Sequence, residues 1–116
     1  MTKDGIKQLV LSTLADMKAK DVSELDVSAL TDMADSMIIA SGTSSRHVRS
    51  IAASVVSKLK EHDVAIVGVE GDDVGDWVLV DLADIILHIM LPESRDFYAL
   101  EKLWASAAAR REASIP

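Results

Sequence analysis

The spacing of apolar residues along the chain predicts an alternation of helices and strands. Residues 3–20 carry apolar side chains at intervals of three and four, which indicates an amphipathic helix with one stripe facing a core. That stripe consists of Ile6, Leu9, Val10, Leu14 and Met17. Leu25 and Val27 then alternate with polar neighbours, which indicates a short strand, and the apolar run at 36–41 is typical of a buried strand.

A second helix is predicted between two further strands. Gly42 ends the strand at its N-terminal side, and Thr43 or Ser44 can cap a helix that runs to about His62. Its apolar stripe keeps helical spacing over Val48, Ile51, Ala52, Val55, Val56 and Leu59. The apolar residues at 64–69 predict the strand that follows.

Two strands at 76–82 and 84–91 are separated by almost no connection. Because a parallel pair needs a crossover of about a dozen residues, these strands must be antiparallel neighbours. Pro92 ends the second strand, and apolar spacing predicts a helix over 95–106 with Ser94 as its N-cap. The order of elements predicts an α/β fold, with a mixed β-sheet and helices packed on it.

Length and composition fit one domain. The chain has 116 residues, of which 49% are hydrophobic and 27% charged, enough for a packed core and typical of globular proteins. We expect a single domain over residues 1–105 and a tail over 106–116 that extends the last helix or frays. The N-terminus has no signal-peptide core, and no apolar run approaches the roughly 20 residues that span a bilayer. These features predict a soluble cytoplasmic protein.

The hairpin over 76–91 predicts two sheet faces of different chemistry. We predict a two-residue turn at Leu82 and Ala83. This turn pairs Trp77 with His88, Leu79 with Ile86, and Asp81 with Asp84. Alternation along the strands places these side chains on one face with Met90, and leaves an aliphatic core face of Val78, Val80, Leu82, Ile85, Leu87 and Ile89. The first face is either a half-exposed surface with Trp77 under a helix, or a docking surface, because Trp is enriched among binding hot spots.

Charge narrows the choice of partner. The formal net charge is -7, whereas a protein that grips nucleic acid through phosphates needs a positive face. Residues 70–84 contain no Lys or Arg, and their acids are Glu70, Asp72, Asp73, Asp76, Asp81 and Asp84. This run is either a solvated loop or a surface for a basic partner.

An enzymatic alternative depends on residues 42–45. Free backbone N–H groups at a helix start attract anions, and a glycine and hydroxyl loop with distant Asp81 and Asp84 resembles nucleotidyltransferase architecture, in which carboxylates hold a metal. The other interpretation is a capped helix with solvated basic residues. The chain has no Cys, and its three His residues show no metal-ligand spacing. We therefore predict no catalytic residue, metal or cofactor.

Three motifs, in order along the chain, resemble those of one known family. The first is the segment 35–48; the second combines 68–71 with Asp76, Trp77, Asp81, Asp84 and His88; the third is the segment 95–104. Together they span roughly residues 3–105 and resemble the ribosomal silencing factors, also called Iojap-like proteins.

The resemblance implies a ribosome-binding protein rather than an enzyme. Such proteins bind ribosomal protein fourteen of the large subunit, on the face that meets the small subunit. The bound factor excludes the small subunit sterically, and translation falls during starvation or stationary phase. The implied fold is a nucleotidyltransferase-like layer without its activity, and the free protein is expected to form homodimers, with little or no direct nucleic-acid contact.

Matching by motif also implies site residues. The partner contacts expected from the resemblance are Trp77 and Tyr98, with Leu79, Asp81 and Glu101 as lesser contacts. The chain departs from the family pattern at Ala83, where glycine is usual in the tight turn, and at Ala34, where Thr is common. A turn with positive φ would strain Ala83. Two alternatives stay open: a nucleotide-binding transferase, and a homodimeric scaffold that pairs through the Trp77 face.

Overall fold

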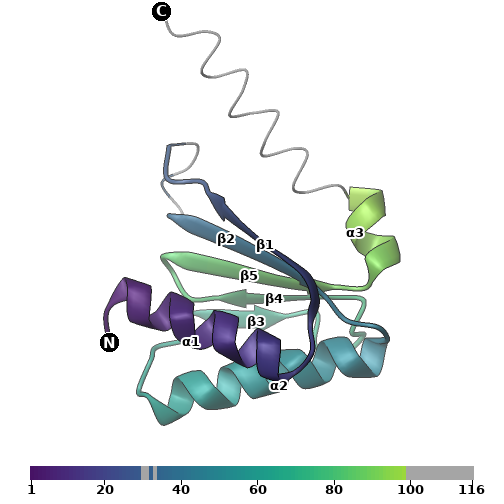
Figure 1. Cartoon of the computed structure of the whole chain (residues 1–116), viewed down its shortest axis with the longest axis horizontal. Coiled ribbons are helices and arrows are strands. Elements are labelled where there is room, and N and C mark those ends of the chain that lie inside the picture. Colours follow the sequence, from purple (N-terminus) through teal and green to yellow (C-terminus); the bar gives the residue numbers. More distant parts are fainter. Residues whose placement is uncertain (30–31, 33, 99–116) are drawn as a thin grey trace, which may run out of the picture.

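A computed structural model describes residues 1–29, 32 and 34–98 of the chain (Figure 1). Within these residues the elements are α1 (Lys3–Asp16), β1 (Lys20–Asp26), β2 (Ser36–Ser41), α2 (Ser45–Glu61), β3 (Gly68–Glu70), β4 (Trp77–Asp81), β5 (Ile85–Met90) and α3 (Pro92–Tyr98).

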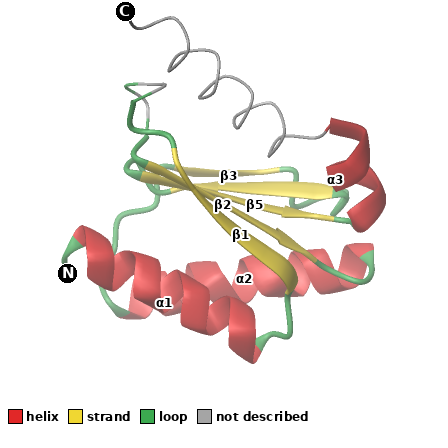
Figure 2. Cartoon of the chain, turned by 45° about the horizontal axis from the view of Figure 1, so that its top comes forward, coloured by secondary structure: helices red, strands yellow, loops and turns green. Residues whose placement is uncertain are grey.

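The strands form one five-stranded sheet in the order β1-β2-β5-β4-β3. β2 and β5 are parallel, and the other neighbours are antiparallel. The predicted α/β fold with a mixed sheet is therefore confirmed. Figure 2 shows α1 and α2 side by side on one face of the sheet, with α3 beyond one end of the strands.

The main core lies between this sheet face and the two helices. Val10 and Leu14 of α1 are fully buried, as are Val48, Ile51 and Leu59 of α2. They meet the aliphatic strand residues Val78, Val80, Leu82, Ile85, Leu87 and Ile89, which confirms the predicted core face of the hairpin. Burying each large side chain contributes about 1.5–3 kcal/mol, so this layer holds most of the apolar stabilisation.

Helix α1 ends at Asp16, so the predicted extent of 3–20 is wrong at its C-terminal end. Lys18 has φ 58°, in the left-handed region. The Ala19 N–H donates to the Leu14 carbonyl at 2.9 Å, and the Lys18 N–H donates to the Ala15 carbonyl at 3.0 Å. These bonds form a Schellman motif, which usually has glycine at the left-handed position. Lysine there leaves no sequence signal for the end of the helix.

Helix α2 ends in the same motif, close to the predicted boundary. Asp63 has φ 57°, its N–H donates to the Lys60 carbonyl, and the Val64 N–H donates to the Leu59 carbonyl at 3.0 Å. Val64 also packs against the core that contains Leu59. At the other end, the Ser44 side chain accepts from the His47 N–H, so the cap is Ser44, one of the two predicted candidates.

The two edge strands differ from their predicted extents. β1 begins at Lys20, well before Leu25, and contains an irregularity between Lys20 and Ser23. β3 covers only Gly68–Glu70, so the strand predicted at 64–69 is wrong over most of its length. Within residues 64–67, Val64 and Ile66 pack against the core although the segment does not form a strand, which explains why its hydrophobicity was misleading.

The β4–β5 turn consists of Ala83 and Asp84, not of Leu82 and Ala83 as predicted. The Leu82 N–H donates to the Ile85 carbonyl at 2.9 Å, which makes these two residues the last pair of the hairpin. The observed pairs are therefore Trp77 with Met90, Leu79 with His88, and Asp81 with Ile86. The predicted register was wrong by two residues. Because side chains alternate with period two, the assignment of residues to faces is nevertheless unchanged.

Helix α3 begins at Pro92, so the predicted start at 95 with Ser94 as N-cap is wrong. Proline suits the first helical position, because its fixed φ is helical and no N–H is needed there. The Arg95 N–H donates to the Leu91 carbonyl at 3.0 Å and closes the first turn. The predicted part of this helix beyond 98, and the tail, lie outside the described residues.

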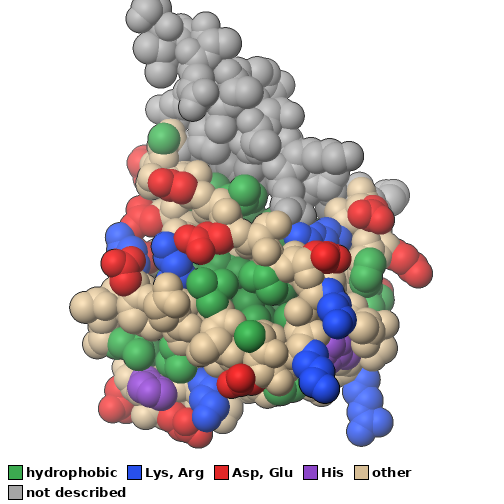
Figure 3. Space-filling model, viewed as in Figure 1, with side chains coloured by type: hydrophobic (Ala, Val, Ile, Leu, Met, Phe, Trp, Pro, Cys, Tyr) green, Lys and Arg blue, Asp and Glu red, His purple; other side chains and the backbone are tan. Residues whose placement is uncertain are grey.

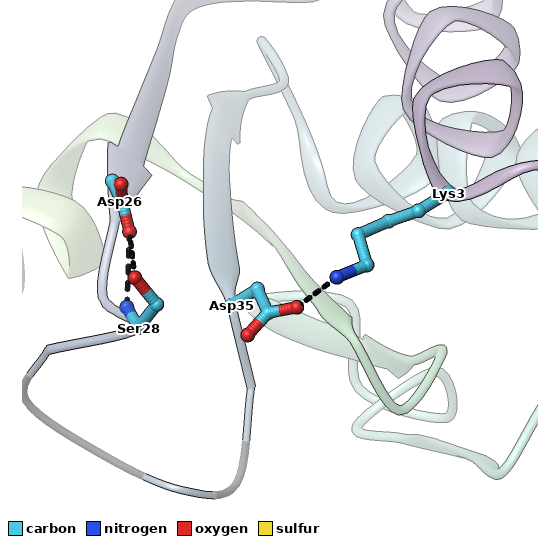
Figure 4. A network of polar contacts seen from close by, with 4 residues as sticks. All are labelled: Lys3, Asp26, Ser28 and Asp35. Carbon is cyan, nitrogen blue, oxygen red and sulfur yellow. Dashed lines mark hydrogen bonds and ion pairs between the residues drawn. The ribbon is translucent and has the colours of Figure 1, made fainter.

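Ion pairs join α1 to Glu24 of β1 and to Asp35, the residue before β2. Lys3 binds the Asp35 carboxylate, and Lys7 binds Glu24 at 2.8 Å. Each carboxylate raises the pKa of its lysine through a hydrogen bond and its charge. Figure 4 shows the first pair beside Asp26, which accepts from both the N–H and the hydroxyl of Ser28. The Lys3–Asp35 pair is exposed on both sides, and pairs of this kind contribute little to stability.

The surface carries charges of both signs. On the side of the molecule shown in Figure 3, acidic and basic side chains are interspersed around a central group of hydrophobic ones. This view therefore shows no continuous basic surface of the kind that grips phosphates. None of the helices in the described part of the chain has the length and apolar character needed to cross a membrane.

Candidate partner-binding site

The sheet face opposite α1 and α2 carries the residues singled out by sequence. Strand register brings together side chains from four strands, and we call this surface the tryptophan face. Its central members are Trp77, Leu79 and Asp81 of β4, Ile86, His88 and Met90 of β5, Met37 and Ile39 of β2, and Glu70 of β3.

Exposure is uneven across the tryptophan face. Ile39 and Met90 are fully buried, and they belong to a second apolar cluster that includes Trp77. The β4 side chains Trp77 and Leu79 are half-buried, and Glu70 is exposed on β3. The accessible part of this face is therefore a strip along β4 and β3, in which an aromatic and an aliphatic residue lie beside an acid, and Ile86 of β5 next to this strip is half-buried as well.

Trp77 contacts His88 on the neighbouring strand. The indole Nε1–H donates to His88 Nδ1 at 2.9 Å, and the ring centroids lie 5.7 Å apart with planes tilted by 44°. The two residues are diagonal rather than directly opposite, since Leu79 is the partner of His88 in the register. Aromatic side chains can reach such diagonal neighbours. Burial lowers the pKa of His88 from 6.5 to about 4.

Asp81 lies at the far end of the strip and holds the hairpin turn. Its Oδ1 accepts from the Ala83 N–H at 2.9 Å, in the local pattern that Asp commonly forms at turns. Ala83 has φ 71°, so the strain expected at this position is present. One oxygen of Asp81 is thus already bonded within the chain.

The acidic run of residues 70–84 divides between two surfaces. Glu70 and Asp81 lie on the tryptophan face. The following loop instead contacts the start of α2: Ser45 Oγ donates to Asp76 Oδ1 at 3.1 Å, and Arg49 donates to the Asp73 carbonyl at 3.3 Å. A groove of about 320 Å³ on that side is lined by Arg49, Ala52, Ala53, Val56, Val69 and Asp72. The fold therefore places Arg49 beside the acidic residues 70–84, a segment that contains no basic residue of its own.

Two glycines shape this loop and were missed by sequence reasoning. Gly71 has φ 83°, and a Cβ there would lie 2.0 Å from the Trp77 carbonyl oxygen. Gly75 has φ 84°, and a Cβ there would lie 2.8 Å from the Ser45 carbonyl oxygen. Both positions require glycine for conformation and for space. Gly71 in particular fixes the backbone at Trp77, and two glycines within an acidic loop were the available signal.

Arg95 is a further residue that sequence reasoning did not assign. Its guanidinium donates to Ser41 Oγ at 2.9 Å and to Ser23 Oγ at 3.1 Å. These bonds join α3 to β2 and β1. Arg95 thereby positions α3, which carries Tyr98, at one end of the sheet.

Residues 42–45 are largely committed to internal contacts. The Thr43 N–H donates to His47 Nδ1 at 2.9 Å, and the His47 N–H is capped by Ser44. His47 Nε2 lies 2.8 Å from the Met17 carbonyl, so the imidazole joins the end of α1 to this loop. Two of the N–H groups that an anion would use are therefore occupied.

The enzymatic alternative requires groups that the fold separates. Gly42 lies beside the end of β5, where its N–H donates to the Met90 carbonyl. Asp84 lies at the start of β5, where its carbonyl accepts from Ser36. A six-residue strand spans roughly 17 Å between these ends. Within the described residues no group of three or more His, Asp or Glu side chains could hold a metal ion.

Two of the expected contacts belong to the C-terminal part of the chain. Tyr98 is the last residue of α3, and its side chain and the whole of Glu101 lie outside the described part of the structure. Of the five expected contacts, the structure places Trp77, Leu79 and Asp81 on one strand and one face.

Comparison with known proteins identifies the family. A family model described as "Ribosomal silencing factor during starvation" matches residues 2–115. The chain belongs to the family of ribosomal silencing factors. Among similar members, the ribosomal silencing factor of Chromobacterium violaceum is 50% identical over 99 residues, covering 85% of this chain and 81% of its own. The Bacillus subtilis factor is 33% identical over 107 residues, covering 92% and 91%.

Solved structures carry the same fold as this family member. The crystal structure of a Chromobacterium violaceum protein superposes with a TM-score of 0.88 at 48% identity, covering 90% of this chain and 88% of that one. A crystal structure from Bacillus halodurans gives a TM-score of 0.80 at 31% identity, with coverage of 88% and 95%. The resemblance seen in the three sequence motifs is thereby confirmed.

Proposed function

We propose that this silencing factor binds the large ribosomal subunit through ribosomal protein fourteen and sterically blocks the small subunit from joining. Binding uses the accessible strip of the tryptophan face, with Trp77 and Tyr98 as main contacts and Leu79, Asp81 and Glu101 as lesser ones. The protein then acts in the cytoplasm, where subunits join, and lowers translation during starvation.

The observation that carries the proposal is the half-buried Trp77 on a sheet face that neither α1 nor α2 covers. A second apolar cluster supports the indole from below, so the side chain offers contact area without a large loss of freedom on binding. Leu79 extends this area along β4, and Glu70 adds a charge that suits a basic protein partner.

The proposed mechanism needs no chemistry. A bound protein occupies the space that the small subunit would fill, so no catalytic group, nucleotide or metal is required. The transferase alternative receives no support from geometry, because residues 42–45 and Asp84 lie at opposite ends of β5. The free protein is proposed to form homodimers that use the same face, so that self-association and ribosome binding compete.

Co-sedimentation with purified large subunits in sucrose gradients tests the site. Trp77→Ala and Tyr98→Ala should each remain folded and lose about 2 kcal/mol of binding free energy, roughly a thirtyfold loss of affinity. Val74→Ala is a matched control, because Val74 is 61% exposed in the acidic loop and lies off the tryptophan face. If the folded Trp77→Ala protein sediments with large subunits as the parent does, the proposed site is wrong.

A further inference from the structure

His88 is a buried polar residue that the proposed binding surface does not itself require. It is 5% exposed, and it lies on β5 between Leu79 of β4 and Ile39 of β2. An aliphatic side chain would fill the same position with no polar group to desolvate. Burying an imidazole here therefore costs desolvation free energy, which a specific hydrogen bond can offset.

The contact that His88 makes is with the proposed anchor. Its Nδ1 accepts the indole Nε1–H of Trp77 at 2.9 Å. Because Nδ1 acts as an acceptor, the neutral ring carries its hydrogen on Nε2. Within the described part of the chain, Nε2 has no hydrogen-bond partner. Within the described residues, the hydrogen bond of the His88 side chain is therefore the one with the Trp77 indole.

We propose that His88 is a positioning residue, which holds the Trp77 indole in one orientation on the tryptophan face before the partner arrives. This inference rests on the proposed function, since it assigns Trp77 as the anchor. A hydrogen bond to Nε1 restricts the side-chain torsions of the indole, in addition to its packing on the second apolar cluster, so less side-chain freedom is lost on binding. Burial lowers the pKa of His88 to about 4, so the Nδ1 acceptor persists at neutral pH.

Two shape-matched variants separate positioning from packing. Asn and Leu share a branched skeleton, but only Asn carries an acceptor oxygen close to the place of Nδ1. His88→Leu should therefore remove the acceptor of the indole Nε1–H, and His88→Asn should keep an acceptor for it. A residue that served packing alone would favour Leu, because this neighbourhood is apolar.

The test begins with the free protein in a Trp104→Phe background, where Trp77 is the single indole. In His88→Leu, the indole N–H resonance should move to the position of an unbonded indole and exchange with water at least severalfold faster. His88→Asn should keep both the position and the slow exchange. An unchanged resonance in His88→Leu, or equal changes in both variants, overturns the proposal.

Affinity for large subunits then tests the consequence. His88→Leu should bind roughly threefold to tenfold more weakly, and His88→Asn within about twofold of the parent. Trp77→Ala separates this proposal from the proposed function. If Trp77→Ala binds large subunits as the parent does, while the indole N–H resonances of His88→Leu and His88→Asn behave as stated, the proposed function is wrong but His88 still positions Trp77. Should His88→Leu not fold, the imidazole nitrogen spectrum of the parent decides: hydrogen on Nε2 supports the proposal, and hydrogen on Nδ1 overturns it.

Discussion

At the scale of single residues, Ala83 holds a backbone conformation that its side chain disfavours. Its φ of 71° lies in the left-handed region, which costs a non-glycine residue about 1–2 kcal/mol. The bond from the Ala83 N–H to Asp81 Oδ1 and the Leu82–Ile85 pair offset this cost. The turn is therefore held by its neighbours rather than by its own preference.

Ala83→Gly should raise the free energy of unfolding by up to about 1 kcal/mol, because relief of strain exceeds the entropy that glycine adds to the unfolded chain. The matched control is Ala53→Gly in the exposed surface of α2, which should lower it by about 1 kcal/mol. Urea denaturation measures both. A loss of stability in Ala83→Gly as large as that in Ala53→Gly would contradict the account.

His88 should make stability depend on pH. Its pKa falls from 6.5 to about 4 on burial, so below 6.5 the unfolded chain takes up a proton that the folded protein does not. Stability is therefore full above pH 6.5 and declines as pH falls toward 4. Linkage at 1.36 kcal/mol per pKa unit gives a loss of roughly 2 kcal/mol between about pH 7.5 and pH 5.

His88→Leu provides the comparison for this effect. Glu70, Asp81 and Arg95 also lie on or beside the tryptophan face, and the variant retains all three. The difference in unfolding free energy between about pH 7.5 and pH 5 should thus be roughly 2 kcal/mol smaller in the variant than in the parent. Equal differences in the two proteins would mean that His88 titrates normally in the folded state.

At the scale of elements, His47 joins α1 to the loop that begins α2. Its two ring nitrogens contact Thr43 and the Met17 carbonyl, so both helices meet through one side chain. His47→Ala should lower the free energy of unfolding by roughly 1–3 kcal/mol, because two bonds are lost and their partners are left unsatisfied.

The third histidine is a matched control for this prediction. His62 is exposed at the end of α2, and within the described residues the hydrogen bond of its side chain is with the nearby Lys58 carbonyl. His62→Ala should change stability by about 0.5 kcal/mol or less. Chemical denaturation measures the free energy of unfolding of both variants. Similar losses in the two would show that the contacts of His47 with Thr43 and Met17 do not stabilise the fold.

How much of each element could be predicted from the sequence also differs from one element to the next. The core stripes of both long helices and the aliphatic face of the hairpin were predicted, because periodicity reports burial directly. The end of α1 was not, since Lys18 occupies the position where glycine would mark it. The hairpin register was missed by two residues, because alternation specifies faces but not partners. Trp77, Leu79 and Asp81 could be grouped on one face, whereas the roles of Gly71 and Arg95 depend on contacts between distant segments.

At the scale of the whole molecule, the acidic residues behind the net charge of -7 lie on different surfaces, so they do not face a partner equally. Glu70 lies on the tryptophan face, while Asp72 lines the groove beside Arg49 of α2. Glu70→Gln should therefore slow association with large subunits about twofold to threefold at low salt, and Asp72→Asn should slow it less. Raising ionic strength should remove the difference, because screening lengths shorten to about 8 Å at physiological salt. Stopped-flow binding measures these rates, and a salt-independent rate would mean that the acids do not steer the protein.

The central claim is that the protein blocks subunit joining by occupancy alone. Light scattering of purified subunits tests this most directly, with increasing protein, fixed magnesium, and nucleotide present or absent. The account predicts that joining falls in proportion to the large subunits occupied, without nucleotide, that Trp77→Ala needs roughly thirtyfold more protein, and that ribosomes already joined resist the factor by mass action. Inhibition well below one protein per large subunit, or a requirement for nucleotide, would contradict it.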